Sequence, residues 1–381
     1  MNSAKGNYLS ATLLTIMGLL VVCNLYTLIP LYQPISLEWQ IPESQAVLAS
    51  SFFSIFYAIG LLTFGPLSEK LGRKNVLMYG MLFSACATLF VSFAGNIHYL
   101  YGFRSLQGFA LGCFAPVAFA YCFDHYTENL RTMTISFINA AFLLAGIAGP
   151  LVSEWLEYSY RWQTVFIVFG FLYAITFVLC AVILRHSMSG AASQSKIWQP
   201  FFYLLSDRKL LTCYLIVFSL LLSFVAFYDS LYQYLLLTYP EQPFILVRSI
   251  GLIGVVSCFF SNSLQKRLKV PSLLLCCSIA IILSFALILI HPVPIVISLA
   301  SILFVAAISI YLPSIISYVG MLGAQYRASA ISLYSFTLLS GTSFGPIISH
   351  AFSFAMTLLI LSCWFMINIL LLYWIKRKTL E

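Results

Sequence analysis

Long apolar runs, separated by short polar segments, account for most of this chain. We predict twelve runs of membrane-spanning length, at 9–32, 45–67, 75–95, 99–122, 131–153, 163–184, 210–237, 244–263, 271–291, 293–318, 327–350 and 352–375. About 20 apolar residues cross the hydrocarbon core as an α-helix, which pairs its own backbone polar groups. The first run is too long for the apolar core of a signal peptide. The pattern therefore predicts an all-α integral membrane protein with about 12 transmembrane helices.

The second half of the chain repeats features of the first half at a constant spacing. The charged turn at 65–74 has a degenerate copy at 261–269, so the spacing is 261 − 65 = 196 residues. At the same spacing, RTMTIS at 131–136 matches RASAIS at 327–332. We therefore predict two pseudo-symmetric six-helix bundles, at 1–188 and 210–381, joined by a polar cytoplasmic linker at 189–209. Parallel repeats of this kind are typical of carriers that bind their substrate between the two halves.

Composition and charge placement agree with a membrane location. Of the 381 residues, 61% are hydrophobic and 8% are charged, whereas soluble proteins carry about 25% charged residues. The net charge of +8 could suggest nucleic acid, but 16 of the 19 basic residues lie on one side of the predicted spans. By the positive-inside rule that side is the cytoplasm. We expect cytoplasmic N and C termini, a multi-pass location in the inner (plasma) membrane, the lipid bilayer as a partner and no nucleic acid.

Three motifs resemble those of the major facilitator superfamily, and together they extend over essentially the whole chain. Gly65-x-Leu67-x-Glu69-Lys70-x-Gly72-Arg73-Lys74 is similar to motif A, with glutamate in place of the usual aspartate. Leu100-x-x-x-Arg104-x-x-Gln107-Gly108 resembles motif B. Ala145-x-x-x-Gly149-Pro150 resembles part of motif C, the antiporter motif, and Gly341-x-x-x-Gly345-Pro346 is its copy at the repeat spacing. Arg161-Trp162 is similar to the twelve-helix drug:proton antiporter branch.

Motif A implies a conformational latch at the cytoplasmic ends of the helices. Gly65 allows close helix approach and Gly72 allows tight backbone geometry. The resemblance implies that Glu69 and Arg73 form a charge network with Asp124, at the inner end of the fourth span, and that this network holds the outward-open state. The alternative is that these charges only set the topology.

Two charged residues fall well inside predicted spans, where a charge costs at least about 2.5 kcal/mol unless it is paired or solvated. Arg104 lies in the fourth span, and Asp229 lies roughly 28 Å along the seventh at 1.5 Å per residue. We predict that both take part in proton coupling, with Asp229 protonated in the outward state and releasing its proton inward as substrate leaves. The alternatives are a snorkelling Arg104, and a static ion pair or an outer-mouth residue at Asp229.

Polar and aromatic residues in the first, fourth and seventh spans are candidates to line a substrate cavity: Asn24, Tyr26, Gln33, Gln107, Tyr228, Tyr232 and Gln233. Such groups suit a moderately polar organic molecule, although an interfacial aromatic belt is the alternative for the tyrosines. Gly149-Pro150 and Gly345-Pro346 are predicted gating sites because they occupy corresponding helices. Kinks without a gating role are the alternative there.

These observations favour a secondary transporter, and the motif C copies favour export. We predict a proton-coupled antiporter that exports a small organic compound, such as a drug, a sugar or a siderophore-like metabolite, by rocker-switch alternating access. The alternatives are a proton-linked uptake symporter and, less favoured, a non-transporting membrane receptor. The sequence has no nucleophile–base set, metal-ligand spacing or nucleotide motif, so we expect no enzyme activity, cofactor or metal. The expected partners are a small-molecule substrate and protons, and a monomer is the family expectation.

Overall fold

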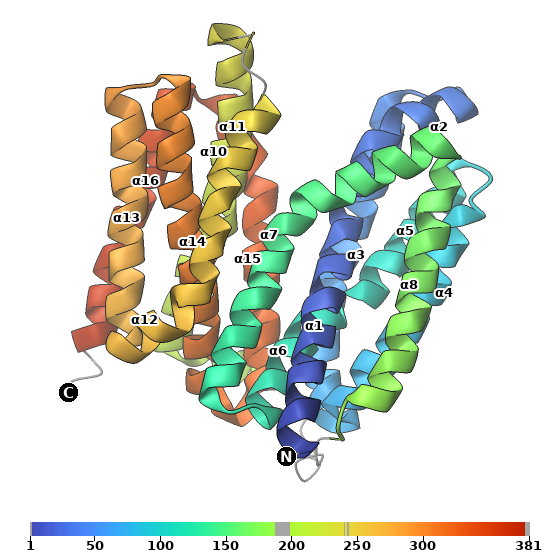
Figure 1. The fold of residues 1–381 in the computed structure, drawn as a ribbon, viewed down its shortest axis with the longest axis horizontal. Coiled ribbons are helices and arrows are strands. Elements are labelled where there is room, and N and C mark those ends of the chain that lie inside the picture. The colour runs from blue at the N-terminus through green and yellow to red at the C-terminus, as the bar shows by residue number, and fades with distance from the viewer. Residues whose placement is uncertain (1, 187–198, 240, 242–243, 378–381) are drawn as a thin grey trace. The chain divides into compact units, whose positions relative to one another are not determined.

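The structure is a computed structural model that describes residues 2–186, 199–239, 241 and 244–377. Within these residues every regular element is helical and no strand occurs (Figure 1). Helices keep each backbone N–H and C=O paired inside one segment, which lipid surroundings require. Eleven segments of the described chain are long and apolar enough to cross a membrane, and each overlaps a predicted span. The predicted all-α membrane class is confirmed.

The helices of the first half run from α1 to α8, and a short α9 precedes the second half. Their bounds are α1 (Asn2–Tyr26), α2 (Tyr32–Trp39), α3 (Glu43–Leu71), α4 (Arg73–Ser92), α5 (Ile97–Leu111), α6 (Phe114–His125), α7 (Glu128–Ser159), α8 (Trp162–Ile183) and α9 (Gln199–Ser206). The second half contains α10 (Arg208–Thr238), α11 (Phe244–Leu252), α12 (Ser261–Arg267), α13 (Val270–Ile290), α14 (Pro294–Leu322), α15 (Arg327–Ala351) and α16 (Phe354–Arg377).

A helix is interrupted at two of the predicted spans. The predicted first span, 9–32, covers most of α1 and a short 3-10 turn, Ile29–Leu31, which contains Pro30, and it ends where α2 begins at Tyr32. Proline cannot donate a backbone hydrogen bond, so it suits a turn between helices. In the fourth span, α5 ends at Leu111 and α6 begins at Phe114. A Cβ on the intervening Gly112 would lie 2.7 Å from Cα of Gly60 on α3, so the two backbones approach closely there.

The predicted span at 244–263 is not one long helix in the structure. It falls on α11, on a 3-10 segment (Ile253–Phe260) and on the start of α12. A Cβ on Gly254 would lie 2.7 Å from the backbone N of Ala306, so α14 packs directly against the backbone at this point. Glycine weakens an α-helix, and a 3-10 stretch is a common response to local strain. The count of twelve spans therefore stays a prediction.

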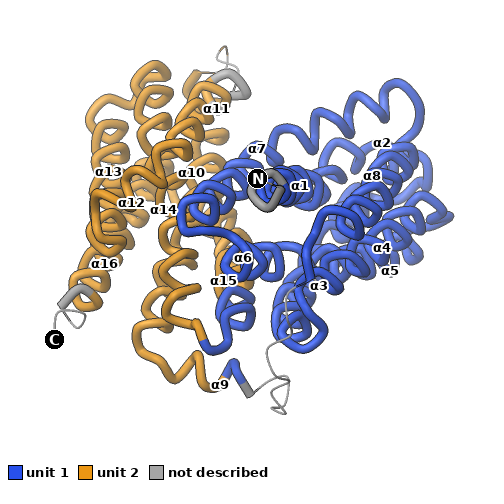
Figure 2. Tube along the Cα trace, turned by 60° about the horizontal axis from the view of Figure 1, so that its bottom comes forward, with its two compact units in different colours: residues 1–201, 325–333 blue, residues 202–324, 334–381 orange. Residues whose placement is uncertain are grey.

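Contacts divide the chain into two compact units (Figure 2). The first contains residues 1–201 and 325–333, and the second contains residues 202–324 and 334–381. In the first unit α1 packs on α7, α3 on α5 and α4 on α8, and in the second unit α13 packs on α14 and on α16. The predicted bundle boundaries stay predictions. The first ten residues of the predicted linker, 189–198, lie outside the described residues, and the rest forms α9, the N-cap Asp207 and the first two residues of α10.

Each unit has a buried hydrogen bond between its first and last membrane helices. In the first unit Asn24 on α1 bonds Tyr173 on α8, and in the second unit Asn368 on α16 donates to Ser219 on α10 at 2.7 Å. The two pairs are related by one spacing, since 219 − 24 and 368 − 173 both give 195. This spacing differs by one residue from the 196-residue spacing of the sequence repeat, so the two pairs lie at nearby but not identical positions of the two halves.

Candidate functional site

Arg104 lies in the middle of α5 and is completely buried in the first unit. Its Nη1 donates to Oε1 of Gln107 at 2.6 Å, and its Nη2 donates to the backbone O of Asn24 on α1 at 3.2 Å. The guanidinium carbon lies 4.2 Å from the ring centroid of Phe53 on α3, a cation–π distance. The motif B arginine is therefore contacted by groups from three helices, α1, α3 and α5.

Gln107 connects Arg104 to the neighbouring helices. Its Nε2 donates to Oδ1 of Asn24 at 2.9 Å and to Oγ1 of Thr88 on α4 at 3.0 Å. Asn24 Nδ2 in turn donates a short hydrogen bond to the hydroxyl of Tyr173. We call these five residues the Arg104 cluster, and all of them are buried. Asn24, Arg104 and Gln107 were sequence candidates, whereas Thr88 and Tyr173 were not, because a single polar residue in an apolar span gives no indication of its partner.

Asp229 lies on α10, where 238 − 229 = 9 residues separate it from the end of the helix at Thr238. Its Oδ2 accepts a short hydrogen bond from the hydroxyl of Ser349 on α15 and lies 3.5 Å from Nε2 of His350. Gln233 Nε2 lies 3.3 Å from Nδ1 of His350. The side chain of Asp229 is 30% exposed and that of His350 is 69% exposed. We call Asp229, Gln233, Ser349 and His350 the Asp229 cluster.

Sequence reasoning did not identify Ser349 and His350. Both follow the predicted gating pair Gly345-Pro346 within a few residues, at the end of α15. A polar pair in the last turn of an apolar span is a usable signal, but it does not reveal which acid it meets. That pairing is a tertiary contact between α10 and α15, because Asp229 and Ser349 are 120 residues apart in the chain.

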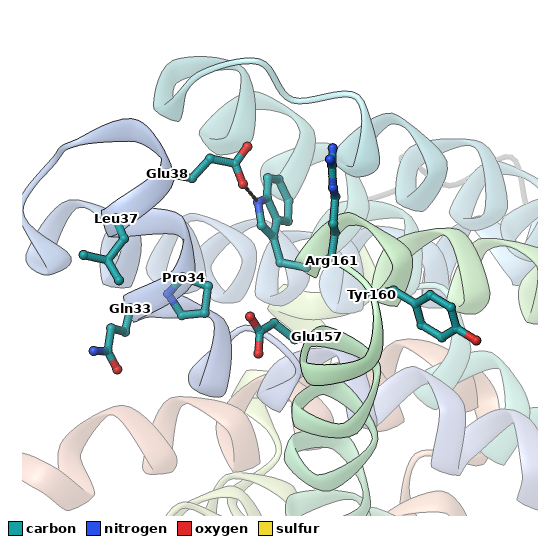
Figure 3. Close-up of a pocket in the computed structure, with 8 residues that line it drawn as sticks. Gln33, Pro34, Leu37, Glu38, Glu157, Tyr160 and Arg161 are labelled. Atoms are coloured by element: carbon teal, nitrogen blue, oxygen red, sulfur yellow. Dashed lines mark hydrogen bonds between the residues drawn. The ribbon is translucent and has the colours of Figure 1, made fainter.

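The remaining cavity candidates are dispersed. Tyr26 is half-buried at the end of α1, Tyr228 is buried and Tyr232 is exposed. Gln33 lies on α2, beyond the 3-10 turn, and is not part of the Arg104 cluster. It lines a separate pocket of about 630 Å³ at the ends of α2, α7 and α8, together with Pro34, Leu37, Glu38, Glu157, Tyr160, Arg161 and Trp162 (Figure 3).

The motif A turn connects α3 to α4 through Gly72. Gly72 has φ 85°, a left-handed value that favours glycine, and this agrees with the prediction of tight backbone geometry. Arg73 Nε lies 3.1 Å from Oδ2 of Asp124 at the end of α6. Arg73 Nη1 also donates to Oγ of Ser68 at 2.7 Å. Asp124 pairs with a second arginine, since its Oδ1 lies 3.4 Å from Nη1 of Arg327.

Glu69 binds the first turn of α15, in the part of that helix that belongs to the first unit. Its Oε1 accepts from the backbone N–H groups of Ala328 at 3.0 Å and Ser329 at 3.2 Å, and its Oε2 accepts from the Ser329 hydroxyl at 3.2 Å. A carboxylate at a helix N-terminus satisfies orphan donors and complements the helix dipole. A Cβ on Gly65 would lie 2.7 Å from the backbone O of Ala328, so glycine allows this close approach.

The motif C prolines lie inside continuous helices. α7 runs through Pro150 and α15 runs through Pro346. A Cβ on Gly149 would lie 2.7 Å from the backbone O of Cys23 on α1, and a Cβ on Gly345 would lie 2.7 Å from Cβ of Val225 on α10. In each unit the glycine thus allows close packing against the first membrane helix.

Comparisons with known proteins agree with this architecture. The family model for the Major Facilitator Superfamily matches residues 14–346. An uncharacterized MFS-type transporter, YybF, of Bacillus subtilis (strain 168) is 27% identical over 334 residues, which are 85% of this chain and 81% of that protein. The multidrug resistance protein MdtL of Shewanella oneidensis is 27% identical over 150 residues, which are 39% of this chain and 38% of that protein.

A solved structure has the same fold. The MFS transporter FucP in the outward conformation superposes with a TM-score of 0.78 at 16% identity, covering 96% of this chain and 98% of that chain. The family match covers most of the chain, and the described residues form eleven helices of membrane-spanning length. This chain belongs to the Major Facilitator Superfamily and is a multi-pass membrane transporter, not an enzyme.

Proposed function

We propose that this transporter is a proton-coupled antiporter that exports a small organic compound by alternating access. The observation that carries the proposal is the Asp229 cluster. Asp229 is the carboxylate farthest from a helix end among the described residues. An ionisable residue inside a membrane helix is expensive, and it therefore indicates a functional site.

The chemistry of the Asp229 cluster suits a proton carrier. A carboxylate is charged when water reaches it and neutral when an apolar cavity closes around it. Asp229 is partly exposed, and Ser349 and His350 supply a hydroxyl donor and a ring nitrogen next to its Oδ2. In the proposed cycle Asp229 accepts a proton from the outer side and the carrier changes state. The proton then leaves to the cytoplasm as the next solute binds, and not as substrate leaves, because an exporter releases its substrate on the outer side.

Arg104 supplies a permanent charge in the other unit. Because an arginine stays protonated in proteins, it cannot itself carry the proton, but it can stabilise a negative group when the cavity opens. We therefore assign proton binding to Asp229 and charge stabilisation to Arg104. Asn24 and Gln107 hold Arg104 in place through the hydrogen bonds described above.

The contacts of Glu69, Arg73 and Asp124 support a latch in this cycle. The two ion pairs of Asp124 and the capping of α15 by Glu69 join α3, α4 and α6 to the first turns of α15. Breaking them together would free that helix start to move. We propose that the latch is closed in one of the two states and open in the other, and that the Gly-Pro positions of α7 and α15 bend during the change.

Two observations favour export over uptake: part of this chain is similar to the multidrug resistance protein MdtL, and the chain has two copies of motif C. The chain spans less than half of that relative's length in the match. We further propose that the termini face the cytoplasm, that the membrane is the inner one and that the protein works as a monomer. A proton-linked symporter is the second candidate function, because the first motif C copy has Ala145 in place of glycine.

Purified protein in proteoliposomes with an imposed pH gradient tests this function. The solutes are indole-3-acetate, indole-3-acetamide, tryptamine and chloramphenicol, and protein-free liposomes correct for passive partitioning. Antiport predicts that an acidic lumen drives accumulation of at least one of these solutes. Accumulation driven by an alkaline lumen instead would establish symport, and absence of proton-linked flux for all four would contradict the proposal.

A further inference from the structure

We propose that Arg104 recognises a negatively charged group of the transported solute, so that the substrate class is a small organic anion. This inference rests on the proposed function and specifies the substrate of the same site. The Arg104 cluster has a charge imbalance. One positive charge is completely buried, and its hydrogen-bond acceptors among the described residues, Gln107 and the backbone O of Asn24, are neutral.

One of the three guanidinium nitrogens has no hydrogen-bond partner. Nη1 and Nη2 donate to the amide oxygen of Gln107 and the backbone oxygen of Asn24. Nε is buried and has no hydrogen-bond partner. The guanidinium carbon lies over the rings of Phe53 and Phe166, at 4.2 and 5.8 Å from their centroids. A planar fork with a vacant Nε–H suits a two-oxygen acceptor such as a carboxylate.

No carboxylate in the described part of the first unit pairs with Arg104. The ion pairs among the described residues join Arg73 and Arg327 to Asp124, and His350 to Asp229. The acids of the first unit stand in the first turn or the last two turns of their helices, away from the middle of α5: Glu38, Glu43, Glu69, Asp124, Glu128, Glu154 and Glu157.

An unpaired charge in a buried site is costly, and breaking a buried pair typically costs several kcal/mol. A neutral cluster around the charge stabilises it only in part. In the carrier state that opens the cavity, an anion on the solute would complete the pair and lower that cost. The repeat has no second arginine, because Ala300 stands 196 residues after Arg104. One such charge favours a solute with a single negative group.

Three probes of nearly equal shape test the charge preference: indole-3-acetate, indole-3-acetamide and tryptamine, which are anionic, neutral and cationic. Equilibrium binding is measured on the full chain in lipid nanodiscs. We expect indole-3-acetate to bind about 10-fold or more tighter than the amide, as a charged hydrogen bond implies. Wild-type protein that binds the anion no better than the amide overturns the proposal, even if no probe binds.

Matched variants locate the preference. Arg104→Gln should reduce the anion-to-amide ratio to about 1, whereas Arg104→Lys should retain part of it. Arg208→Gln is the control, because it makes the same change at an exposed arginine at the start of α10. An undiminished ratio in Arg104→Gln overturns the proposal, as does an equal loss in Arg208→Gln.

A second variant keeps the test decisive if Arg104→Gln fails to fold. Asn24→Asp places a carboxylate inside the Arg104 cluster, on the residue whose backbone O accepts from Nη2 of Arg104. We expect it to abolish the preference for indole-3-acetate and to raise the affinity for tryptamine. If Asn24→Asp ranks the affinities for the three probes in the same order as the wild-type protein, the proposal is contradicted.

Two further measurements are needed. One distinguishes an organic anion from an inorganic anion, and the other distinguishes failure of anion recognition from failure of the antiport function. Chloride and inorganic phosphate serve as competitors, and competition equal to that of indole-3-acetate contradicts an organic substrate. Proton-linked transport of tryptamine or of the amide without any preference for the anion would overturn this inference and leave the antiport function standing. Anion binding without proton-linked flux would do the reverse.

Discussion

Glu69→Gln should release the first turn of α15. The carboxylate accepts two backbone N–H groups, those of Ala328 and Ser329, and also the Ser329 hydroxyl. N–H groups in the first turn have no partner within their own helix, so Glu69 supplies acceptors that the helix lacks. Glutamine preserves the shape of the side chain but removes its charge and one of its two acceptor oxygens.

The size of the effect follows from these contacts. Loss of an N-terminal cap costs about 0.5–2 kcal/mol, and loss of a negative charge at the helix N-terminus adds about 0.3–1 kcal/mol at partly exposed positions. A neutral amide oxygen retains some of the first term. We therefore expect the first turn of α15 to open more readily by about 1–2 kcal/mol, which is roughly a 5- to 30-fold change in the opening equilibrium.

Hydrogen–deuterium exchange of the protein in nanodiscs measures this opening directly. The amides of Ala328 and Ser329 should exchange about 5- to 30-fold faster in Glu69→Gln. Glu128→Gln is the matched control, because Glu128 is an exposed glutamate at the start of α7. Unchanged protection of the two amides in Glu69→Gln, or an equal increase in the control, would refute the assignment of Glu69 as the cap of α15.

Two further predictions concern glycines in the first unit. Gly149→Ala should lower the free energy of unfolding by about 1–3 kcal/mol, because the new Cβ would lie 2.7 Å from the backbone O of Cys23. Thermal denaturation measures this, and Gly95→Ala is the control, because a Cβ there has nothing within 4 Å. Gly72→Ala should cost about 1–2 kcal/mol because L-residues disfavour its φ of 85°. A melting temperature equal to that of wild type would contradict either prediction.

The fold class followed from the sequence because lipid leaves few structures for a long apolar run. Span positions were predictable for the same reason, and the positive φ of Gly72 follows from the chemistry of a tight charged turn. The interruptions were not predictable in detail. The interruption at Ile253–Phe260 coincides with close packing of Gly254 against α14, and nothing local in the sequence indicates that contact.

The charged members of the candidate site could be singled out from the sequence, but their pairings could not. Arg104 and Asp229 stand out because charges are rare in apolar spans. Tyr173, which accepts from Asn24 in the Arg104 cluster, and His350, which lies beside Asp229, come from helices distant in the chain, so only the packing reveals them. Gln33 illustrates the converse, since the turn after α1 carries it away from Asn24 into a separate pocket.

Solute-driven proton movement is the most direct test of the claim that Asp229 carries the coupled proton. Proteoliposomes with a trapped pH-sensitive dye are given, without a pH gradient, the solute that moves protons in the wild-type protein. Wild-type protein should change the lumenal pH, whereas Asp229→Asn should exchange the solute across the membrane with no pH change. Solute-driven proton movement at the wild-type rate in Asp229→Asn would contradict the claim.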